Sequence, residues 1–491
     1  MSQFPDYRLA KMDLLKELGV HLYPERFPVT HSLLAGSQLP DGTQGVRVAG
    51  RVIAIRKLGK LTFVHIQDVE ARLQVSLRKD SLGDAYDQFH KTIDIGDFIG
   101  AEGEIFTTKT GEKTVMAERY TFLGKALREL PEKWHGLTDT ELRYRQRYLD
   151  LISNADSRRV FLLRSKLLRT IRHFLEERGF IEVETPILTN QASGALATPF
   201  ATHHNALDID AYLRIAPETY LKRCVVGGFQ HVFEVARCFR NEGISPVHLQ
   251  DFTMIEGYSA YFNYEDNMRL LRELILHILD ELFGTRELTI GEHQINFGQE
   301  WPVVTFRELI LKDAGIDIDQ YPDGPSLFQA IKEKGIRIEH ENAEKLGKGN
   351  LVDQLYKKIS RPSLISPTFL TAHPIELSPL ARQNDNNPNI TDRFQLVVNG
   401  AEIINAYSEL VDPIDQRQRL EVQANLRSQG DAEAMPLDND YLKAMEYGMP
   451  PISGWGMGID RLLQVLLNLD NIRDGVLFPF MRPLEQQSAD E

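Results

Sequence analysis

FRNEGISPVHLQDF, residues 239–252, is the stretch that decides the fold. The segment before it, HVFEVAR (231–237), and the segment after it, DFTMIEGYSAYF (251–262), both alternate apolar with polar residues. Such alternation predicts two half-buried strands, and the glycine and proline between them predict the turn of a hairpin. The sequence therefore indicates a hairpin whose strands belong to a core and whose mouth is charged.

The mouth of this hairpin carries side chains suited to an anionic ligand. The loop contains Arg240, Glu242 and His248, and Phe252 lies at the start of the return strand. An arginine held at the end of a strand can donate two hydrogen bonds to a phosphate. A neighbouring aromatic ring and a histidine can hold a base and further phosphate oxygens. A surface hairpin with a salt bridge is the alternative, and this stretch alone leaves both open.

A second candidate site is the glycine-rich stretch GWGMGIDR, residues 454–461, which we expect to open the last helix and to place Arg461 in its first turns. Glycine lets other parts of the chain approach closely. The spacing matches neither GxGxxG nor GxxxxGK[ST], so neither a Rossmann nor a P-loop nucleotide site is predicted. Close helix–sheet packing is the competing interpretation.

A third candidate site is acidic and lies in the predicted strand AEIINAYSEL, residues 401–410. Side chains alternate between the two faces of a strand, so Asn405, Tyr407 and Glu409 share one face. Glu402 lies on the other face unless a bulge intervenes.

The return strand of the hairpin repeats the same theme with Glu256 and Tyr258. Carboxylates on strands that read as core are costly to bury unless a cation compensates them. The two strands therefore predict a cationic ligand or Mg²⁺, with an internal salt bridge as the alternative.

The chain of 491 residues is long enough for several domains. We divide it into an N-terminal helical segment (1–45), a barrel (46–126), a linker (127–156), a large α+β domain (157–485) and a disordered tail (486–491). Residues 46–126 contain five short alternating runs separated by Gly, Asp and Lys, as in a small OB-type barrel. Strong helical periodicity over 157–178 is followed by a predicted strand that ends at Pro186.

Composition and charge restrict the class of protein. The net charge is −14, which argues against a general DNA-binding role, yet residues 46–125 carry 13 Lys and Arg against 11 Asp and Glu. This asymmetry fits a barrel that touches nucleic acid. We expect no membrane-spanning helix and no secretory signal, and the two cysteines cannot form a disulfide framework. A cytoplasmic location follows. The arginines 143, 145 and 147 of the linker are expected on a solvated helix face.

Taken together, these motifs resemble a known family. GFIEVETPIL (179–188), the hairpin mouth (239–252) and GMGIDR (456–461) look like the three motifs of class II aminoacyl-tRNA synthetases. RYRQRYLDL (143–151) and NAYSEL (405–410) are similar to lysyl-tRNA synthetases in particular, and the resemblance covers roughly residues 45–485. It implies an α+β multidomain protein: an N-terminal five-stranded OB-type β-barrel, then a class II catalytic domain with an antiparallel sheet flanked by helices.

The resemblance also implies a reaction, the ATP-dependent attachment of L-lysine to tRNA(Lys) through a lysyl-adenylate. It implies three catalytic residues, Arg240, Glu402 and Arg461, and ATP contacts from Arg240, Glu242, His248, Phe252, Glu402 and Arg461. The lysine-binding residues it implies are Gly194, Glu218, Arg240, Glu256, Tyr258, Asn405, Tyr407 and Glu409. Mg²⁺ is the expected cofactor, and a homodimer is the expected assembly.

Two more sets of residues follow from the resemblance. The barrel reads the tRNA anticodon with Arg56, Phe63 and Gln74. Glu402 binds Mg²⁺ together with position 395, where Gln395 stands in place of the usual glutamate and removes one negative charge from the site.

Two alternative functions remain to be weighed. Gln395 and Leu249, which stands where an asparagine is usual, motivate a non-catalytic or regulatory RNA-binding paralogue. An aspartate- or asparagine-specific synthetase shares the same architecture, but the acidic pair Glu256 and Glu409 suits a cationic substrate.

Overall fold

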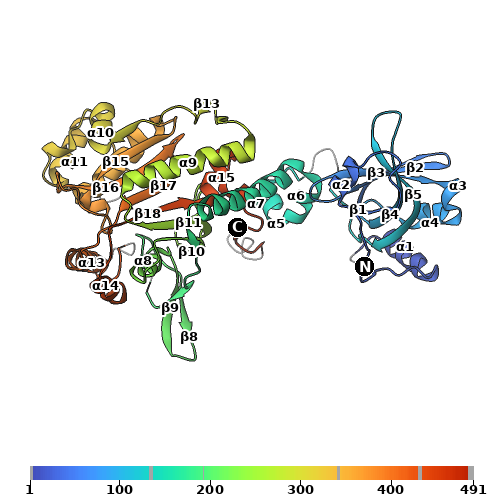
Figure 1. The fold of residues 1–491 in the computed structure, drawn as a ribbon, viewed down its shortest axis with the longest axis horizontal. Helices are drawn as coiled ribbons and strands as arrows, with labels where there is room; N and C mark the ends of the chain where they lie inside the picture. The colour runs from blue at the N-terminus through green and yellow to red at the C-terminus, as the bar shows by residue number, and fades with distance from the viewer. Residues whose placement is uncertain (1–3, 132–136, 192, 340–342, 429–433, 485–491) are drawn as a thin grey trace. The chain divides into compact units, whose positions relative to one another are not determined.

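The computed structural model describes residues 4–131, 137–191, 193–339, 343–428 and 434–484. The chain divides into two compact units, Met1–Arg159 and Val160–Glu491, coloured from blue to red along the chain in Figure 1. The boundaries placed at 45, 126 and 156 stay predictions, and the tail 486–491 lies outside the described residues.

The first unit is built around a closed barrel with the strand order β1-β2-β3-β5-β4. Its inward residues, among them Val48, Val64 and Val75, are fully buried because alternate side chains of each strand point into the barrel. The strands are β1 (Val46–Leu58), β2 (Leu61–Gln67), β3 (Arg72–Arg78), β4 (Phe98–Thr107) and β5 (Lys113–Gly124). The helices are α1 (Asp6–Glu17), α2 (Leu33–Gln38), α3 (Lys79–Leu82), α4 (Asp84–Thr92), α5 (Thr140–Arg145) and α6 (Arg147–Ser153).

One expectation about the linker is wrong. Arg147 is buried rather than solvated, and its Nη1 donates a 2.8 Å hydrogen bond to Asp150 Oδ2. Arg143 donates from Nε to the other oxygen of Asp150 at 3.2 Å. The buried carboxylate of Asp150 needs cationic partners, and that need draws the arginines inward.

The second unit contains an eight-stranded sheet with the order β14-β15-β16-β17-β18-β11-β10-β6. Neighbouring strands are antiparallel except at the two edges, where β14 and β6 run parallel to their partners. The sheet strands are β6 (Ile181–Glu182), β10 (His231–Phe239), β11 (Asp251–Ala260), β14 (Val303–Thr305), β15 (Thr368–Pro374), β16 (Ile390–Val398), β17 (Ala401–Ser408) and β18 (Ile452–Gly458). Two smaller sheets contain β7 (Leu188–Thr189), β8 (Ala201–His204), β9 (Ile209–Leu213), β12 (Glu287–Ile290) and β13 (His293–Asn296).

Helices cover one face of the large sheet, as α9 shows in Figure 1. Buried residues of α7, α9 and α15 form one apolar cluster with Phe233, Ile255, Ile404 and Met457 of the strands. Because side chains alternate, the neighbours of these residues along each strand point to the opposite face. Helix α7 (Ala155–Glu176) begins in the first unit and continues into this one. The other helices of this unit are α8 (Glu218–Val226), α9 (Tyr264–Phe283), α10 (Phe306–Ala314), α11 (Gly324–Glu333), α12 (Lys348–Leu355), α13 (Pro413–Ser428), α14 (Asn439–Glu446) and α15 (Ile459–Leu466).

The glycine-rich stretch is itself a strand, which corrects the expectation that it opens a helix. β18 covers Ile452–Gly458, and α15 begins only at Ile459. A Cβ on Gly454 would lie 2.2 Å from the Tyr258 ring and 2.4 Å from Glu409 Oε1. Glycine is therefore needed at position 454 to leave room for these two side chains, which lie on the face of the sheet away from helices α7, α9 and α15.

The strand predicted to end at Pro186 is also shorter than expected. β6 comprises Ile181–Glu182, at the edge of the large sheet. Val183 still donates its N–H to the carbonyl of Phe233 at 2.9 Å. Beyond Val183 the chain leaves the large sheet, and Leu188 and Thr189 pair with β9 in a separate small sheet.

Candidate active site

A cavity of about 340 Å³ lies on the face of the sheet opposite the helices. It brings together most of the predicted ligand-binding residues: Gly194, Glu218, Arg240, Glu242, His248, Phe252, Glu256, Tyr258, Glu402, Asn405, Tyr407 and Arg461. Two of the predicted residues, Gln395 and Glu409, do not line the cavity. Gln395 contacts Glu402 from behind the cavity wall, and Glu409 lies beside Tyr258. Leu249 is part of the wall.

A β-bulge places Glu402 in this cavity. Along β16 and β17, Leu396 pairs with Ile404 but the next residue, Val397, pairs with Glu402. The extra residue, Ile403, shifts the alternation by one, so Glu402 and Asn405 face the same side. The sequence left open whether a bulge turns Glu402 to this face, and the structure contains that bulge.

The mouth of the hairpin gathers basic side chains. The Arg240 guanidinium lies over the Phe252 ring at 5.1 Å, and its Nε is buried without a hydrogen-bond partner in the described part of the chain. Burial, followed by the charge of Arg461, lowers the pKa of His248. Arg461 donates from Nη1 to the carbonyl of Glu402 at 3.2 Å. An unpaired buried donor beside two further basic groups suits an anion such as a phosphate or carboxylate.

The other end of the cavity is acidic. Glu218 Oε1 accepts hydrogen bonds from Tyr407 Oη at 2.7 Å and from Lys222 Nζ at 2.6 Å. Tyr258 donates from its hydroxyl to Glu256 Oε2 at 3.0 Å. Glu409, which is 1 % exposed, forms an ion pair with Lys222.

Lys222 is a functional candidate that the sequence reasoning missed. It is fully buried on α8, four residues after Glu218, and both Tyr407 and Tyr441 place their rings 5.7 Å from its Nζ. Burial alone would lower the pKa of Lys222, but the charges of Glu218 and Glu409 raise it well above its ordinary value, so it stays a cation. The signal in the sequence was a Glu–Lys pair at i, i+4 within α8.

Burial and mutual repulsion favour the protonated form of the acidic groups. Burial, followed by the negative charge of Glu218, raises the pKa of Glu256 to about 8. Burial also raises the pKa of Glu409, against the opposing effect of Lys222. Among the described residues, Lys222 is the one cation that forms an ion pair with any of these three carboxylates, so this end of the cavity is short of positive charge.

The residues near Glu402 fit a magnesium ion that takes most of its ligands from elsewhere. Gln395 donates from Nε2 to Glu402 Oε2 at 2.8 Å, and the buried Gln395 Oε1 has no partner among the described residues. One carboxylate and one amide oxygen are both oxygen donors of the kind Mg²⁺ uses. The described residues contain no group of three or more His, Cys, Asp or Glu side chains that could hold a metal ion by themselves. Phosphate oxygens and water would have to complete the coordination.

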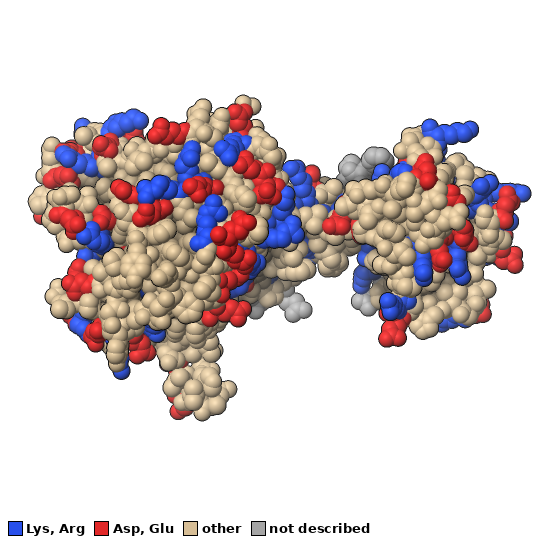
Figure 2. All heavy atoms as spheres, viewed as in Figure 1, with Lys and Arg blue, Asp and Glu red and all other residues tan. Residues whose placement is uncertain are grey.

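The remaining predicted residues lie on the barrel strands outside the apolar core: Arg56 is exposed, Phe63 is half-buried and Gln74 is buried. Phe63 of β2 pairs with Arg56 of β1 and with Ser76 of β3, so these three lie side by side across three strands. Phe63 is half-buried and is not part of the barrel core. On the face drawn in Figure 2, basic and acidic side chains of the barrel are interspersed, so no single basic patch marks a binding surface there.

Gln74 of β3 pairs with His65 of β2, and both ends of its amide already form hydrogen bonds. It is buried, donates from Nε2 to Glu112 Oε2 at 2.7 Å and accepts from Thr114 Oγ1 at 2.8 Å. The other oxygen of Glu112 lies 2.7 Å from His65 Nε2. Glu112 and His65 were not predicted, and they give this surface a polar row beside the Phe63 ring.

The chain is similar to known proteins over nearly its whole length. The family of class II tRNA synthetases (D, K and N) matches residues 139–482, and the OB-fold nucleic acid binding domain matches residues 46–123. Lysine–tRNA ligase of Carboxydothermus hydrogenoformans is 46% identical over 98% of this chain and 99% of its own. Those of Moorella thermoacetica and Bacillus cereus (strain B4264) are 46% and 43% identical, covering 98% and 97% of this chain and 98% and 96% of theirs. The chain belongs to the lysine–tRNA ligase family.

Membership in the lysine–tRNA ligases confirms the predicted fold class, an OB-type barrel followed by a class II synthetase domain. Within the described residues, no helix is long and apolar enough to cross a membrane. The cavity lies wholly within the second unit, which contains most of the synthetase match.

The raised pKa of Glu256 predicts a pH-dependent effect on stability. Its pKa is about 8 in the folded chain against an ordinary 4.5, so the stability it contributes is complete below about pH 4.5 and is lost as the pH rises through about 8. Glu256→Gln stays neutral throughout. The variant should therefore gain melting temperature relative to the unaltered protein at about pH 8.5 but not at about pH 5.

Thermal unfolding of the ligand-free protein at both pH values measures this difference. Glu446→Gln, at an exposed position on α14, is the control and should show no such change. An equal difference in melting temperature at both pH values would mean that Glu256 is not protonated in the empty cavity.

Proposed function

We propose that this chain, like the lysine–tRNA ligases to which it belongs, uses ATP to attach L-lysine to tRNA in translation, through the residues of the cavity described above. We choose lysine as the substrate because the buried carboxylates at the acidic end outnumber the cations that pair with them. We place the reaction in the cytoplasm, on the ground that Cys224 and Cys238 are both free thiols.

The charge deficit matches lysine in number. At the acidic end, the described residues place three buried carboxylates, Glu218, Glu256 and Glu409, around one cation, Lys222, which pairs with Glu218 and Glu409. Lysine brings two ammonium groups, which compensate the remaining two carboxylates, while its carboxylate meets Arg240. Aspartate would add another negative charge to a site already short of cations. The balance therefore argues against an aspartate-specific enzyme.

The hairpin residues would act on ATP. Arg240 would hold the α-phosphate together with the lysine carboxylate, His248 and Arg461 would hold the outer phosphates, and Phe252 would stack on the adenine beside Glu242. The reaction is an attack of the lysine carboxylate on the α-phosphorus, which needs no nucleophile from the protein. Positioning and neutralisation of charge by arginines are sufficient to promote it.

We propose Mg²⁺ as the cofactor, held by Glu402 and, through its amide oxygen, by Gln395. When bound, the ion supplies positive charge to the phosphate oxygens as the bond to pyrophosphate breaks. Gln395 is the weaker of the two ligands because it is neutral. Its amide would have to turn so that Oε1, rather than Nε2, faces Glu402.

Lysine-dependent ATP–pyrophosphate exchange tests the proposed reaction. Each amino acid is supplied in turn over a series of Mg²⁺ concentrations. Lysine alone should drive exchange, and chelation of the metal should abolish it. Exchange with aspartate or asparagine would contradict the assignment of the acidic pocket, and exchange with no amino acid would favour the non-catalytic paralogue.

Glu409→Gln tests the pocket in the same assay. It removes one carboxylate next to Lys222, so the lysine concentration for half-maximal exchange should rise at least about tenfold, as expected for a lost hydrogen bond to a charged group. Glu446→Gln, which removes an exposed carboxylate, should leave that concentration unchanged. An unchanged lysine requirement in Glu409→Gln would remove Glu409 from the binding site.

We propose that the barrel reads the anticodon, with Phe63 as the stacking ring, Arg56 as a backbone or base contact, and Gln74 as an edge reader. Support comes from the row Arg56–Phe63–Ser76, in which Arg56 is exposed and Phe63 is half-buried, and from the match to a nucleic acid binding fold. Because Gln74 already uses both ends of its amide, it would contact a base together with Glu112.

Phe63→Ala should weaken the charging of tRNA(Lys) by about tenfold or more, since a stacked base contributes roughly 1–3 kcal/mol. Pyrophosphate exchange, which needs no tRNA, should be unaffected. Phe98→Ala is the control, because Phe98 is an exposed aromatic of β4 that stacks with Arg51 at 4.2 Å. Equal loss of both activities in Phe63→Ala would contradict an anticodon role.

We propose that two copies of the chain associate. Support comes from the first-motif region, where three apolar side chains, Ile181, Ile187 and Leu188, are between 45% and 51% exposed. Such a group at a sheet edge is suited to burial against a second copy. Light scattering of the active protein should give twice the 56.0 kDa mass of one chain, and an active monomer would contradict the proposal.

A further inference from the structure

Arg393 of β16 is a basic residue in the wall of the cavity that the roles above do not use. It donates from Nε to Asn405 Oδ1 at 2.9 Å. Its Nη1 donates to the carbonyl of Leu377 and to Ser378 Oγ, both at 2.9 Å. Burial lowers the pKa of Arg393, but an arginine stays charged over the working range. The guanidinium is thus held by three neutral acceptors.

The bond between Arg393 and Asn405 fixes which end of the Asn405 amide faces the cavity. A guanidinium has donors only, so the amide atom 2.9 Å from its Nε must be the oxygen. The nitrogen, Nδ2, is then directed away from Arg393, and we find no partner for it in the described part of the chain. Asn405 therefore presents a hydrogen-bond donor.

The surroundings of Asn405 show where this donor is needed. Gly456 pairs with Glu256 on one side and with Asn405 on the other, so the three form one row across the sheet. The glycine leaves space between an acceptor, Glu256, and a donor, Asn405. An α-amino acid has an ammonium and a carboxylate on one carbon, which such a row can bind at its opposite ends.

We propose that Arg393 is a positioning residue that turns the Asn405 amide so that its N–H groups meet the carboxylate of the amino acid substrate. This inference rests on the proposed binding of lysine in the cavity. With the amide turned over, Oδ1 would face that carboxylate and repel it. Arg393 thus determines whether this end of the row attracts or rejects the reacting carboxylate.

Two other roles for Arg393 predict different results. If Arg393 contacted the substrate directly, its removal would weaken binding whether or not Asn405 is present. If it only held the backbone at Leu377 and Ser378, its removal would weaken every ligand of the cavity, with or without a carboxylate.

The test is calorimetric binding of L-lysine and of L-lysinamide, which keeps both ammonium groups and replaces the carboxylate by a neutral amide. Arg393→Met should weaken L-lysine by about 10- to 100-fold, the range for one hydrogen bond to a charged group, and should change L-lysinamide less than about twofold. In an Asn405→Ala background, Arg393→Met should have no further effect on L-lysine.

Several outcomes would overturn the inference. Equal weakening of both ligands would assign Arg393 to the scaffold, and additive effects in the double variant would assign it a direct contact. If L-lysinamide binds too weakly to measure, the double-variant cycle on L-lysine decides by itself. If the unaltered protein binds no lysine, the proposed function fails instead.

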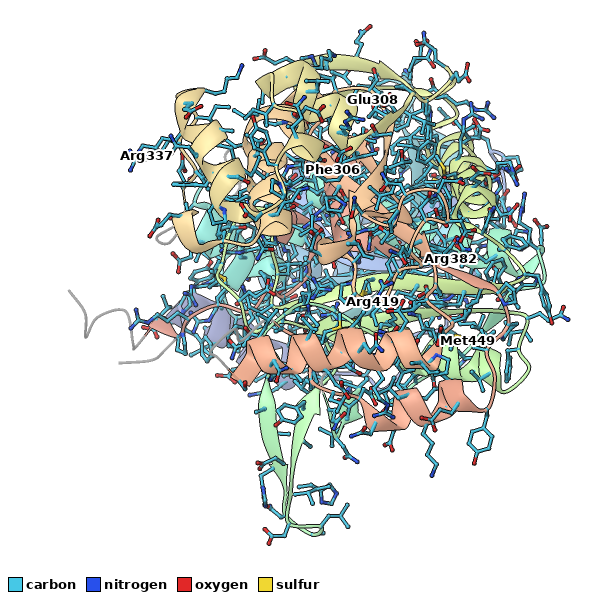
Figure 3. The ribbon with its side chains drawn as sticks, turned by 90° about the vertical axis from the view of Figure 1, so that its left-hand side faces the viewer. Phe306, Glu308, Arg337, Arg382, Arg419 and Met449 are labelled. Atoms are coloured by element: carbon cyan, nitrogen blue, oxygen red, sulfur yellow. The ribbon has the colours of Figure 1, made fainter. Side chains whose placement is uncertain are left out.

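Further variants guard against misfolding. Arg393→Lys keeps the charge but cannot donate to three acceptors at once, so it should fall between the unaltered protein and Arg393→Met. Asn405→Asp should weaken L-lysine more than Asn405→Ala does, because it directs an oxygen at the carboxylate; tolerance of this change would contradict the inference. Arg382→Met is the matched control, since Arg382, labelled in Figure 3, pairs with Asp385 and Asp392 and does not line the cavity.

Discussion

The alternation of side chains along β11, β17 and β18 is the constraint on which the rest of the second unit depends. Helices α7, α9 and α15 bury one face of the sheet against apolar residues such as Ile255 and Met457. Every second residue is then forced to the other face, where charged and polar side chains meet across neighbouring strands. The cavity on that face is therefore a consequence of how the core is packed, because strand residues form its floor.

Much of this arrangement could be predicted from the sequence. Alternating strands, the hairpin mouth and the class II motifs gave the fold class and the residues that line the cavity. The signals were local: a period of two, a turn, and charged residues where apolar ones are expected. Resemblance to a family with well-separated motifs then supplied the order of the parts.

What could not be predicted depends on contacts between distant segments. The burial of Arg147 follows from Asp150, and the length of β6 follows from its position at a sheet edge. The strand β18 was mistaken for the start of a helix because its glycines carry no strand preference of their own; one of them, Gly454, makes room for Tyr258 and Glu409. Lys222 and Arg393 were missed because their importance lies in partners that are close only in the folded chain.

The bulge at Ile403 shows that part of the site is encoded by a count rather than by a residue type. The side chain of Ile403 belongs to the apolar cluster on the helix-covered side of the sheet, so its chemistry is that of the core. Because Ile403 is one additional residue in the strand, Glu402 is turned toward the cavity. A chain that lacked one residue at this point would keep its sheet and its acidic residues. It would nevertheless bury the carboxylate of Glu402 among hydrocarbon, so that spacing along this strand is under a constraint as strict as that on the acidic residue itself.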